Sequence, residues 1–252
     1  MDKKASGMLY FSCCISVENR EEFLMNIRIL QLVEGAQKAR GLTVIIDVFR
    51  AFTVEAWLSH NHAAAIIPVG DIQTALDYRA KHPDALLCGE RGGRKIEGFD
   101  FGNSPSAIEP TDLTGKTVVH TTSAGTQGIA NAIGAKEIIG GALVNASAIA
   151  RYIRKQDPDE VSLVCMGLAG LEETQEDTLC ARYIKSLLED QPIADMDAEI
   201  DILKRTSGAK FFDPAQQDVF PEDDFHLSTQ VDRFDFVLRY DRETGLMHRL
   251  DI

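Results

Sequence analysis

The 252-residue sequence predicts an α/β fold in which a mixed, largely parallel sheet is covered by helices on both faces. From Gly41 onward, short apolar runs alternate with helix-length segments, a pattern typical of parallel strands joined by helices. Near the C-terminus, two strand-like runs flank "DRETG", which indicates a hairpin with Gly245 at its turn and adds an antiparallel pair. A chain of this length buries one large core, so we expect a single domain over residues 25–252.

The individual elements follow in order along the chain. The first strand is expected at "MNIRILQL" from Met25, and residues 1–24, which show no convincing period, are treated as an N-terminal extension. The later strand candidates are residues 42–47, 63–69, 84–91, 116–122, 136–145, 160–167, 234–240 and 246–252. The helix candidates are residues 51–60, 71–81, 146–155 and 176–189.

Composition excludes several classes of protein. The net charge of -13 argues against a nucleic-acid binder, because such proteins cluster Lys and Arg against phosphates. No apolar run approaches the ~20 residues of a membrane span, and no cleavable leader is evident, so we expect a cytoplasmic protein without a membrane partner. The five cysteines are odd in number and lack C-x-x-C spacing, which favours reduced thiols.

Polar side chains follow five of the predicted strands. In open α/β sheets, ligands bind beyond the carboxyl ends of the strands, so these side chains are expected to meet at one edge. They are Asp47 and Arg50, Glu90 and Arg91, Thr121 to Thr126, Asn145, and the loop from Gly167 to Glu176 and Asp177.

Each of these residues also has a purely structural interpretation. Asp47 is placed to cap the helix that follows it, and Arg50 to pair with a surface carboxylate. Glu176 and Asp177 in a first helical turn complement the helix dipole. The glycines around Glu90 are typical of an exposed turn.

The stretch "VVHTTSAGTQGIANA" (residues 118 to 132) is the seam between a strand and a helix. Such a seam leaves backbone N–H groups unpaired beyond the end of the strand, which indicates an anion site. Acidic residues suit Mg²⁺ and arginines suit phosphate. The acidic residues, the arginines and the seam all fall on one predicted edge of the sheet. Together they predict a magnesium-assisted phosphate site.

Six segments resemble the 2-phosphosulfolactate phosphatase family, also called the ComB family. They are "VIIDVFRAFT" (44 to 53), "GERGG" (89 to 93), "GFDFGNSP" (98 to 105), "TTSAGT" (121 to 126), "GALVNASA" (141 to 148) and "ED" (176 to 177). The resemblance implies a three-layer α/β/α fold. It also implies Mg²⁺-dependent hydrolysis of the phosphate from 2-phospho-3-sulfolactate, a step towards coenzyme M.

On this interpretation the protein is a Mg²⁺-dependent phosphatase of a small anionic phosphate ester, expected as a homodimer. Asp47 is a metal ligand or the nucleophile, two roles that the sequence does not separate. Glu176 and Asp177 complete the metal coordination or orient water, and Glu90 is a further acidic candidate. The residues assigned to substrate and phosphate binding are Arg50, Arg91, Asn103, Ser104, Thr121, Thr122, Ser123, Gly125, Thr126 and Asn145.

Three residues depart from the family pattern. Ala124 stands where family members usually have asparagine in "T-T-x-N-G-T", and Phe49 and Phe52 add aromatic bulk after Asp47. These departures leave the exact substrate open. The same departures leave open a non-enzymatic alternative, a sensor or carrier that binds the anion without turnover. The cluster of carboxylates distinguishes the two, because a pure anion binder gains nothing from it.

Two further motifs offer competing chemistry. "CGERGGR" fits the C-x5-R spacing of metal-independent phosphatases, with Cys88 as a thiolate nucleophile. His60 and His62 have H-x-H spacing, although at a helix end they more often cap carbonyls. His120 precedes the seam and is an interior hydrogen-bonded residue or a general acid.

Overall fold

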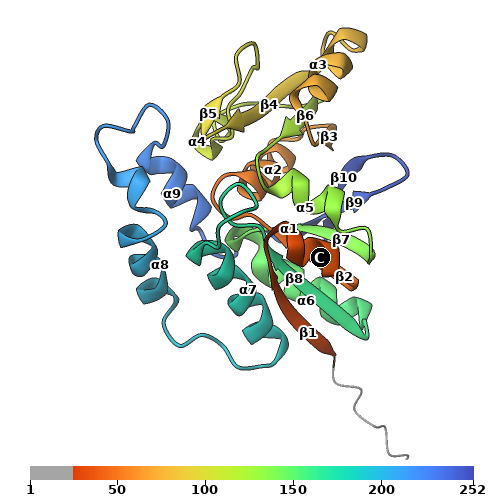
Figure 1. Ribbon diagram of the computed structural model, residues 1–252, viewed down its shortest axis with the longest axis vertical. Coiled ribbons are helices and arrows are strands. Elements are labelled where there is room, and N and C mark those ends of the chain that lie inside the picture. The colour runs from red at the N-terminus through yellow and green to blue at the C-terminus, as the bar shows by residue number, and fades with distance from the viewer. Residues whose placement is uncertain (1–24) are drawn as a thin grey trace, which may run out of the picture.

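The computed structural model describes residues 25–252, and its ten strands form one sheet in the order β1-β8-β2-β7-β9-β10-β3-β6-β4-β5 (Figure 1). The extension expected at residues 1–24 lies outside the described residues. The strands are β1 (Asn26–Gln31), β2 (Gly41–Ile46), β3 (Ala65–Pro68), β4 (Leu86–Arg91), β5 (Arg94–Lys95), β6 (Thr117–Thr121), β7 (Ala135–Gly141), β8 (Glu160–Cys165), β9 (Phe236–Asp241) and β10 (Leu246–Asp251).

Helices connect most of these strands along the chain. The α-helices are α1 (Leu32–Lys38), α2 (Ala51–His60), α3 (Ile72–Lys81), α4 (Pro105–Ile108), α5 (Gly125–Asn131), α6 (Ala146–Gln156), α7 (Gln175–Leu188), α8 (Met196–Arg205) and α9 (Glu222–Ser228). Two 3₁₀ turns, η1 (Leu143–Asn145) and η2 (Ala209–Phe212), complete the set.

The sheet consists of two parallel halves joined by an antiparallel hairpin. Strands β1, β8, β2 and β7 pair in parallel, and so do β3, β6 and β4. The hairpin β9–β10 pairs antiparallel with β7 on one side and with β3 on the other. Three successive antiparallel pairings separate β7 from β3, so the two parallel halves run in opposite directions and their carboxyl ends do not share one edge of the sheet.

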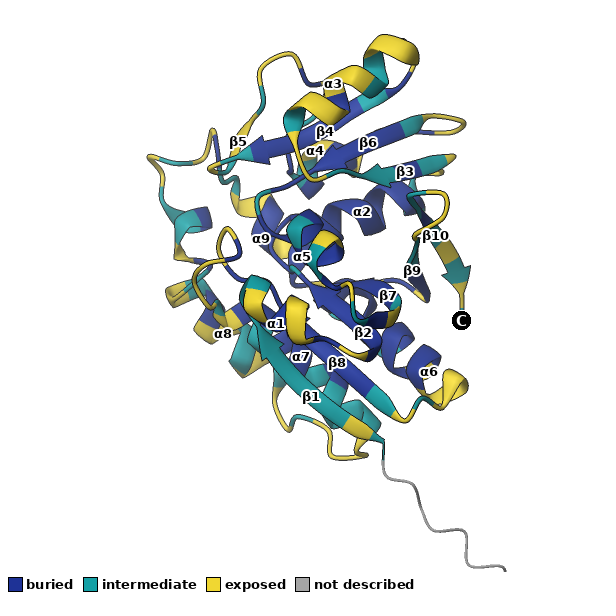
Figure 2. Ribbon diagram, turned by 45° about the vertical axis from the view of Figure 1, so that its right-hand side comes forward, coloured by how far each residue is buried: buried dark blue, intermediate teal, exposed yellow. Residues whose placement is uncertain are grey.

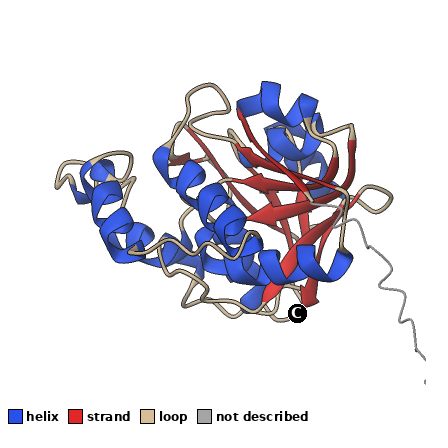
Figure 3. Cartoon of the chain, turned by 90° about the horizontal axis from the view of Figure 1, so that it is seen from below, coloured by secondary structure: helices blue, strands red, loops and turns tan. Residues whose placement is uncertain are grey.

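Strand β2 shows why the fold has three layers. Its sequence "GLTVII" is buried throughout, as expected of a strand covered on both faces. Because side chains alternate along a strand, Val44 packs in the cluster that contains Ile149 of α6, whereas Ile45 packs in the cluster that contains Val54 of α2. Figure 3 shows helices on both sides of the strands, which confirms the α/β/α prediction.

Helix α2 is buried on almost every side. Residues 51 to 59 are all buried, and Trp57 packs edge-on against Phe234. Figure 2 shows α2 in dark blue inside the molecule. Although Thr53 and Glu55 are polar, the helix is buried as a core helix would be, and it leads directly out of the loop that carries Asp47 and Arg50.

Most predicted elements are confirmed, including the hairpin, where Gly245 has φ +72° at the turn. Helix α5 is the helix expected after the seam, whereas helices α1, α4, α8 and α9, the short strand β5 and the two 3₁₀ turns were not among the predicted elements. No helix within residues 25–252 combines the length and apolar character needed to cross a bilayer. Three cysteines of this part of the chain, Cys88, Cys165 and Cys180, are buried free thiols, as expected.

Candidate functional site

One cavity, of about 480 Å³, collects residues from both halves of the sheet and from the C-terminal helices. Six of the predicted site residues line it, namely Asp47, Arg50, Glu90, Asn103, Ser123 and Glu176. The other lining residues are Phe49, Gly92, Gly93, Ala124, Gly167, Leu168, Ala169, Thr174, Ser207, Lys210 and Phe220. The predicted strand exits therefore do come together in part, but the prediction of one shared edge is wrong, because Asp47 follows a strand of one half and Glu90 and Ser123 belong to strand ends of the half that runs in the opposite direction.

Asp47 follows β2 directly and stands among other carboxylates. Its pKa is raised well above the usual value, first because burial removes water and then because Asp177, Glu90 and Glu176 repel its charge. Helix α2 begins after Arg50 without a side-chain cap, so the capping interpretation of Asp47 is wrong. The wall is tight here, since a Cβ on Gly125 would lie 3.1 Å from Asp47 Oδ2.

Glu90 bridges two backbone segments across the cavity wall. Its Oε1 accepts a hydrogen bond from the Ser123 amide and its Oε2 accepts one from the Gly93 amide, both at 2.8 Å. The side chain is buried, and Gly93 has φ +81°, a conformation that favours glycine. The turn interpretation of "CGERGGR" is thus correct in part, but the turn closes onto the seam through Glu90.

Glu176 and Asp177 are adjacent and have different surroundings. Asp177 accepts hydrogen bonds from the amides of Val48 and Gly167, each at 2.8 Å, so it joins the exits of β2 and β8. Burial, and then the charge of Glu176, raise the pKa of Asp177 to about 8. Glu176 lines the cavity, and its buried Oε2 has no hydrogen-bond partner among the described residues.

The seam satisfies much of its hydrogen bonding internally. The Thr126 amide donates to Thr122 Oγ1 at 3.2 Å, and Thr126 Oγ1 donates to the Thr122 carbonyl at 3.0 Å. Glu90 takes the Ser123 amide. Helix α5 begins at Gly125 without a side-chain cap. The protein's own carboxylate and hydroxyl groups therefore occupy several of the donors that the sequence suggested for an anion.

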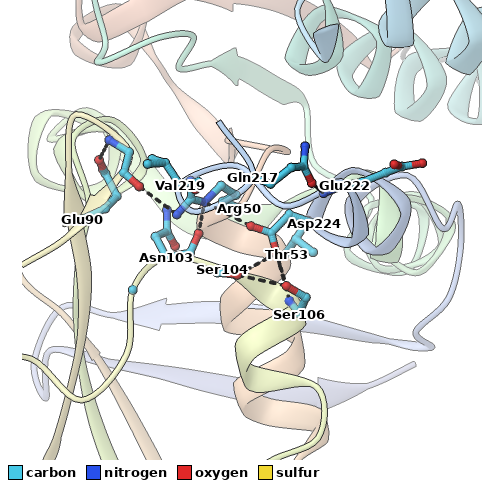
Figure 4. A network of polar contacts seen from close by, with 12 residues as sticks. Arg50, Thr53, Glu90, Asn103, Ser104, Ser106, Gln217, Val219, Glu222 and Asp224 are labelled. Atoms are coloured by element: carbon cyan, nitrogen blue, oxygen red, sulfur yellow. Dashed lines mark hydrogen bonds and ion pairs between the residues drawn. The ribbon is translucent and has the colours of Figure 1, made fainter. Parts of the chain in front are cut away.

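Arg50 is held by backbone carbonyls rather than by a surface carboxylate (Figure 4). Its Nε donates to the Asn103 carbonyl, and Nη1 and Nη2 donate to the carbonyls of Val219 and Gly93, both at 3.0 Å. Asp224 of α9 lies 3.7 Å away and is fully buried. Arg50 has φ +89°, a strained conformation for a residue with a Cβ, and such strain often marks functional sites.

Four predicted binding residues have partners elsewhere and do not line the cavity. Arg91 Nη2 donates to Thr121 Oγ1 at 3.0 Å, and Ser104 Oγ donates to Asp224 Oδ1 at 2.7 Å. Asn145 Oδ1 accepts from the Ala142 amide at 3.1 Å, within the turn before α6. Thr122, Gly125 and Thr126 shape the seam without lining the cavity.

His120 is an interior residue, as one of the two predictions stated. Its Nδ1 lies 2.9 Å from Glu55 Oε1 and its Nε2 lies 3.1 Å from Asn103 Oδ1. His120 and Glu55 are both buried, and only Asn103 reaches the cavity. A histidine engaged at both ring nitrogens in this way orients Asn103.

Cys88 does not have the surroundings of a nucleophile. It is fully buried in β4, its Sγ donates to the Gly102 carbonyl at 3.2 Å, and burial raises its pKa. Arg94, the arginine of the C-x5-R pattern, reaches Asp218 in an exposed ion pair at 3.4 Å. A reactive thiolate needs a lowered pKa and access to solvent, so this geometry opposes the cysteine mechanism.

The residues present fit a divalent cation only in part. Within residues 25–252, no group of three or more His, Cys, Asp or Glu side chains is placed to hold a metal ion. Asp47 and Glu176 nevertheless both line the cavity, their charges repel, and Glu176 keeps an unpaired buried oxygen. Proteins commonly hold Mg²⁺ with one or two carboxylates plus phosphate oxygens, and this pair suits that mode.

Sequence reasoning missed the contribution of the C-terminal helices. Ser207, Lys210 and Phe220 line the cavity, and Asp224 anchors the Arg50 loop from behind. The one available signal was the aromatic run "KFF" with its single lysine, which does not indicate a site without the fold.

Comparison with known proteins adds independent findings. The family described as 2-phosphosulpholactate phosphatase matches residues 27–243. A "Probable 2-phosphosulfolactate phosphatase" of Caldicellulosiruptor saccharolyticus is 45% identical over 150 residues, covering 57% of this chain and 61% of that protein. A protein of the same name from Carboxydothermus hydrogenoformans is 39% identical over 168 residues, covering 66% and 69%. The chain thus spans about 61% of the length of the first of these relatives.

Proposed function

The chain belongs to the 2-phosphosulpholactate phosphatase family, and we propose that it hydrolyses the phosphate ester of a small organic acid, 2-phospho-3-sulfolactate. The observation that carries the proposal is the composition of the cavity. Carboxylates from three separate elements and the cations Arg50 and Lys210 line one space of about 480 Å³. A space of this size suits a small ligand, and a pure anion binder gains nothing from three carboxylates.

We further propose that Asp47 and Glu176 hold a Mg²⁺ ion. When bound, the ion would offset the negative charge of the phosphoryl group and polarise its oxygens. The raised pKa of Asp47 supports this proposal, because a cation relieves the repulsion among the carboxylates around it. Asp177 accepts hydrogen bonds from the amides of Val48 and Gly167 and so fixes the backbone next to the two proposed ligands.

The remaining residues position the substrate. Glu90 holds the seam against the glycine turn through its two backbone hydrogen bonds. Arg50 holds its own loop in place by donating hydrogen bonds to the carbonyls of Asn103 and Val219. In this reaction water attacks phosphorus and the bond between phosphorus and the bridging oxygen breaks. The organic acid leaves as an alcohol that keeps this oxygen and takes up a proton, and the water oxygen stays in the inorganic phosphate. Asp47 at the cavity wall is placed to orient that water.

The decisive experiment measures inorganic phosphate released from 2-phospho-3-sulfolactate and from a panel of small phosphate esters, with Mg²⁺ and with EDTA. Turnover in Mg²⁺ that disappears in chelator supports both proposals. Undiminished turnover in chelator refutes the metal proposal alone, and absence of turnover on every ester refutes the function.

A second measurement tests the metal pair without turnover. Calorimetric titration of the purified protein with Mg²⁺ should show binding that Glu176→Gln weakens by at least about 10-fold, because the variant loses one of two charged ligands. Glu173→Gln, an exposed change three residues earlier, is the control. Equal affinity in both variants would remove Glu176 from the site. A cytoplasmic location, a homodimer and a role in coenzyme M synthesis stay predictions.

A further inference from the structure

Lys210 is a cation that lines the cavity and has no role in the proposed reaction. It belongs to η2 and lies against three aromatic rings, with its Nζ 5.9, 5.5 and 5.2 Å from the ring centroids of Phe49, Phe211 and Phe220. Such rings attract an ammonium group and exclude water on their side. The side chain is half-buried and lines the cavity.

The ammonium group has no anion of its own in the described part of the chain. Within residues 25–252 it forms no hydrogen bond and no ion pair, although Glu176, Asp47 and Asp177 attract it from a distance. Burial lowers the pKa of Lys210, because water is removed from the charge. A partly desolvated ammonium whose donors are open toward a cavity is suited to bind an anion there.

Arg50 is less available for this task than Lys210. Three of its donors already serve the carbonyls of Asn103, Val219 and Gly93. The two cations approach the same ring, since the Arg50 Cζ lies 5.3 Å from the Phe220 centroid and the Lys210 Nζ lies 5.2 Å from it. Lys210 comes from η2 in the C-terminal part of the chain, whereas Asp47 and Glu90 come from the ends of β2 and β4.

We propose that Lys210 binds one of the two acid groups that the substrate carries besides its phosphate, the sulfonate or the carboxylate, and thereby selects phosphate esters that carry a further acid. The inference rests on the proposed function. It follows from the different contacts of the two kinds of residue: the carboxylates suit a cation with the phosphoryl group, whereas Lys210 lies against aromatic rings and forms no ion pair within residues 25–252. A plain phosphate ester leaves this ammonium without a partner.

Binding of the two products separately tests the assignment without turnover. The probes are 3-sulfolactate, which has both acids and no phosphate, and inorganic phosphate, each titrated calorimetrically into the full-length wild type and Lys210→Met. We expect the variant to bind 3-sulfolactate about 10- to 100-fold more weakly and inorganic phosphate within about 2-fold of the wild type. Lys210→Arg should retain most of the affinity for 3-sulfolactate, because it keeps the charge.

The matched control is Lys204→Met, which removes a lysine of α8 whose one ion pair within residues 25–252 is with Asp201 at 3.5 Å. Equal weakening of both probes would assign Lys210 to the phosphoryl group and overturn the proposal. Unchanged affinity for 3-sulfolactate, or its failure to bind the wild type, would also overturn it. Circular dichroism and urea unfolding of each variant confirm that the comparison is between folded proteins.

Kinetics then connect the site to the reaction. For 2-phospho-3-sulfolactate, Lys210→Met should lower kcat/KM by about 10- to 100-fold, whereas for isopropyl phosphate, which has the same three-carbon skeleton and no further acid, kcat/KM should be unchanged. An equal loss on both esters contradicts the proposal. If the wild type hydrolyses neither ester, the proposed function fails while the binding result still decides the role of Lys210.

Discussion

Glu90 should contribute to stability through its two backbone hydrogen bonds and not only through its charge. Its oxygens accept from the amides of Ser123 and Gly93 at 2.8 Å, and the side chain is 7% exposed. Glutamine in the same place offers one accepting oxygen and turns an NH₂ group toward the other amide. Glu90→Gln therefore loses one hydrogen bond to a charged acceptor, which is worth about 1.5–3 kcal/mol.

Losing this hydrogen bond should lower the melting temperature by a measurable amount, and relief of charge repulsion should offset part of the loss. A change of 1 kcal/mol shifts the melting temperature of a chain of this length by about 2–4 °C, so we expect Glu90→Gln to melt roughly 3–12 °C lower. Removing the negative charge also relieves its repulsion of Asp47, which reduces the cost and lowers the pKa of Asp47 toward its usual value. The net change should thus lie in the lower part of the range.

The assay is urea unfolding at pH 7 in chelator, and phosphate release is measured separately, in Mg²⁺, on samples of the same preparations. Glu97→Gln, the same chemical change on an exposed turn, is the control. The Glu90 variant should also lose about 100-fold in turnover, since a displacement of 1 Å at a reacting group costs about that much. If Glu90→Gln has the same urea midpoint and the same turnover as Glu97→Gln, Glu90 does not have the bridging role.

Three further predictions follow from the site. Asp47→Asn should lower phosphate release at least about 100-fold without lowering the melting temperature at pH 8, because it removes a charge that neighbouring carboxylates repel; normal turnover, or a large loss of stability, would contradict the assignment. Cys88→Ser should keep most of the activity, since the thiol is buried outside the cavity; a folded but inactive variant would restore the cysteine mechanism. The pKa of Asp177 is raised to about 8 from an unfolded value of about 4, so the folded state binds this proton more tightly and the free energy of unfolding should fall as the pH rises from 4 to 8. Urea unfolding across this range should show a flatter profile for Asp177→Asn than for the wild type, and equal slopes would contradict the shift.

The polar chemistry of the strand exits was predictable because it is local to each strand. Each of Asp47, Glu90 and Ser123 follows or ends a strand whose apolar run is visible in the sequence. Parallel strands carry their carboxyl ends to the same edge within each half, but the two halves run in opposite directions, so the meeting of Asp47 with Glu90 and Ser123 depends on tertiary packing. The sequence did not indicate that the sheet consists of two parallel halves, since the hairpin that joins them is the last element of the chain.

The orientation of neighbouring side chains was not predictable. Glu176 and Asp177 are consecutive residues of α7, and on a helix they point in directions about 100° apart. Which of the two faces the cavity depends on how α7 packs against β8, and that packing directs Asp177 toward the amides of Val48 and Gly167. The residues between α7 and β9 present the same problem, since Lys210 reaches the site only through tertiary packing.

The seam shows how a correct local argument reaches a different partner. Unpaired amides at a strand-to-helix junction attract negative charge, and the Ser123 amide does bind a carboxylate, but that carboxylate belongs to Glu90. A phosphoryl group that competed for this amide would be placed beside the charges of Glu90 and Asp47. On the proposals above, the positive charge that makes room for a dianion must then come from a cation held by Asp47 and Glu176. Lys210 is left to a further acid, and this division explains why the cavity contains carboxylates and an unpaired ammonium together.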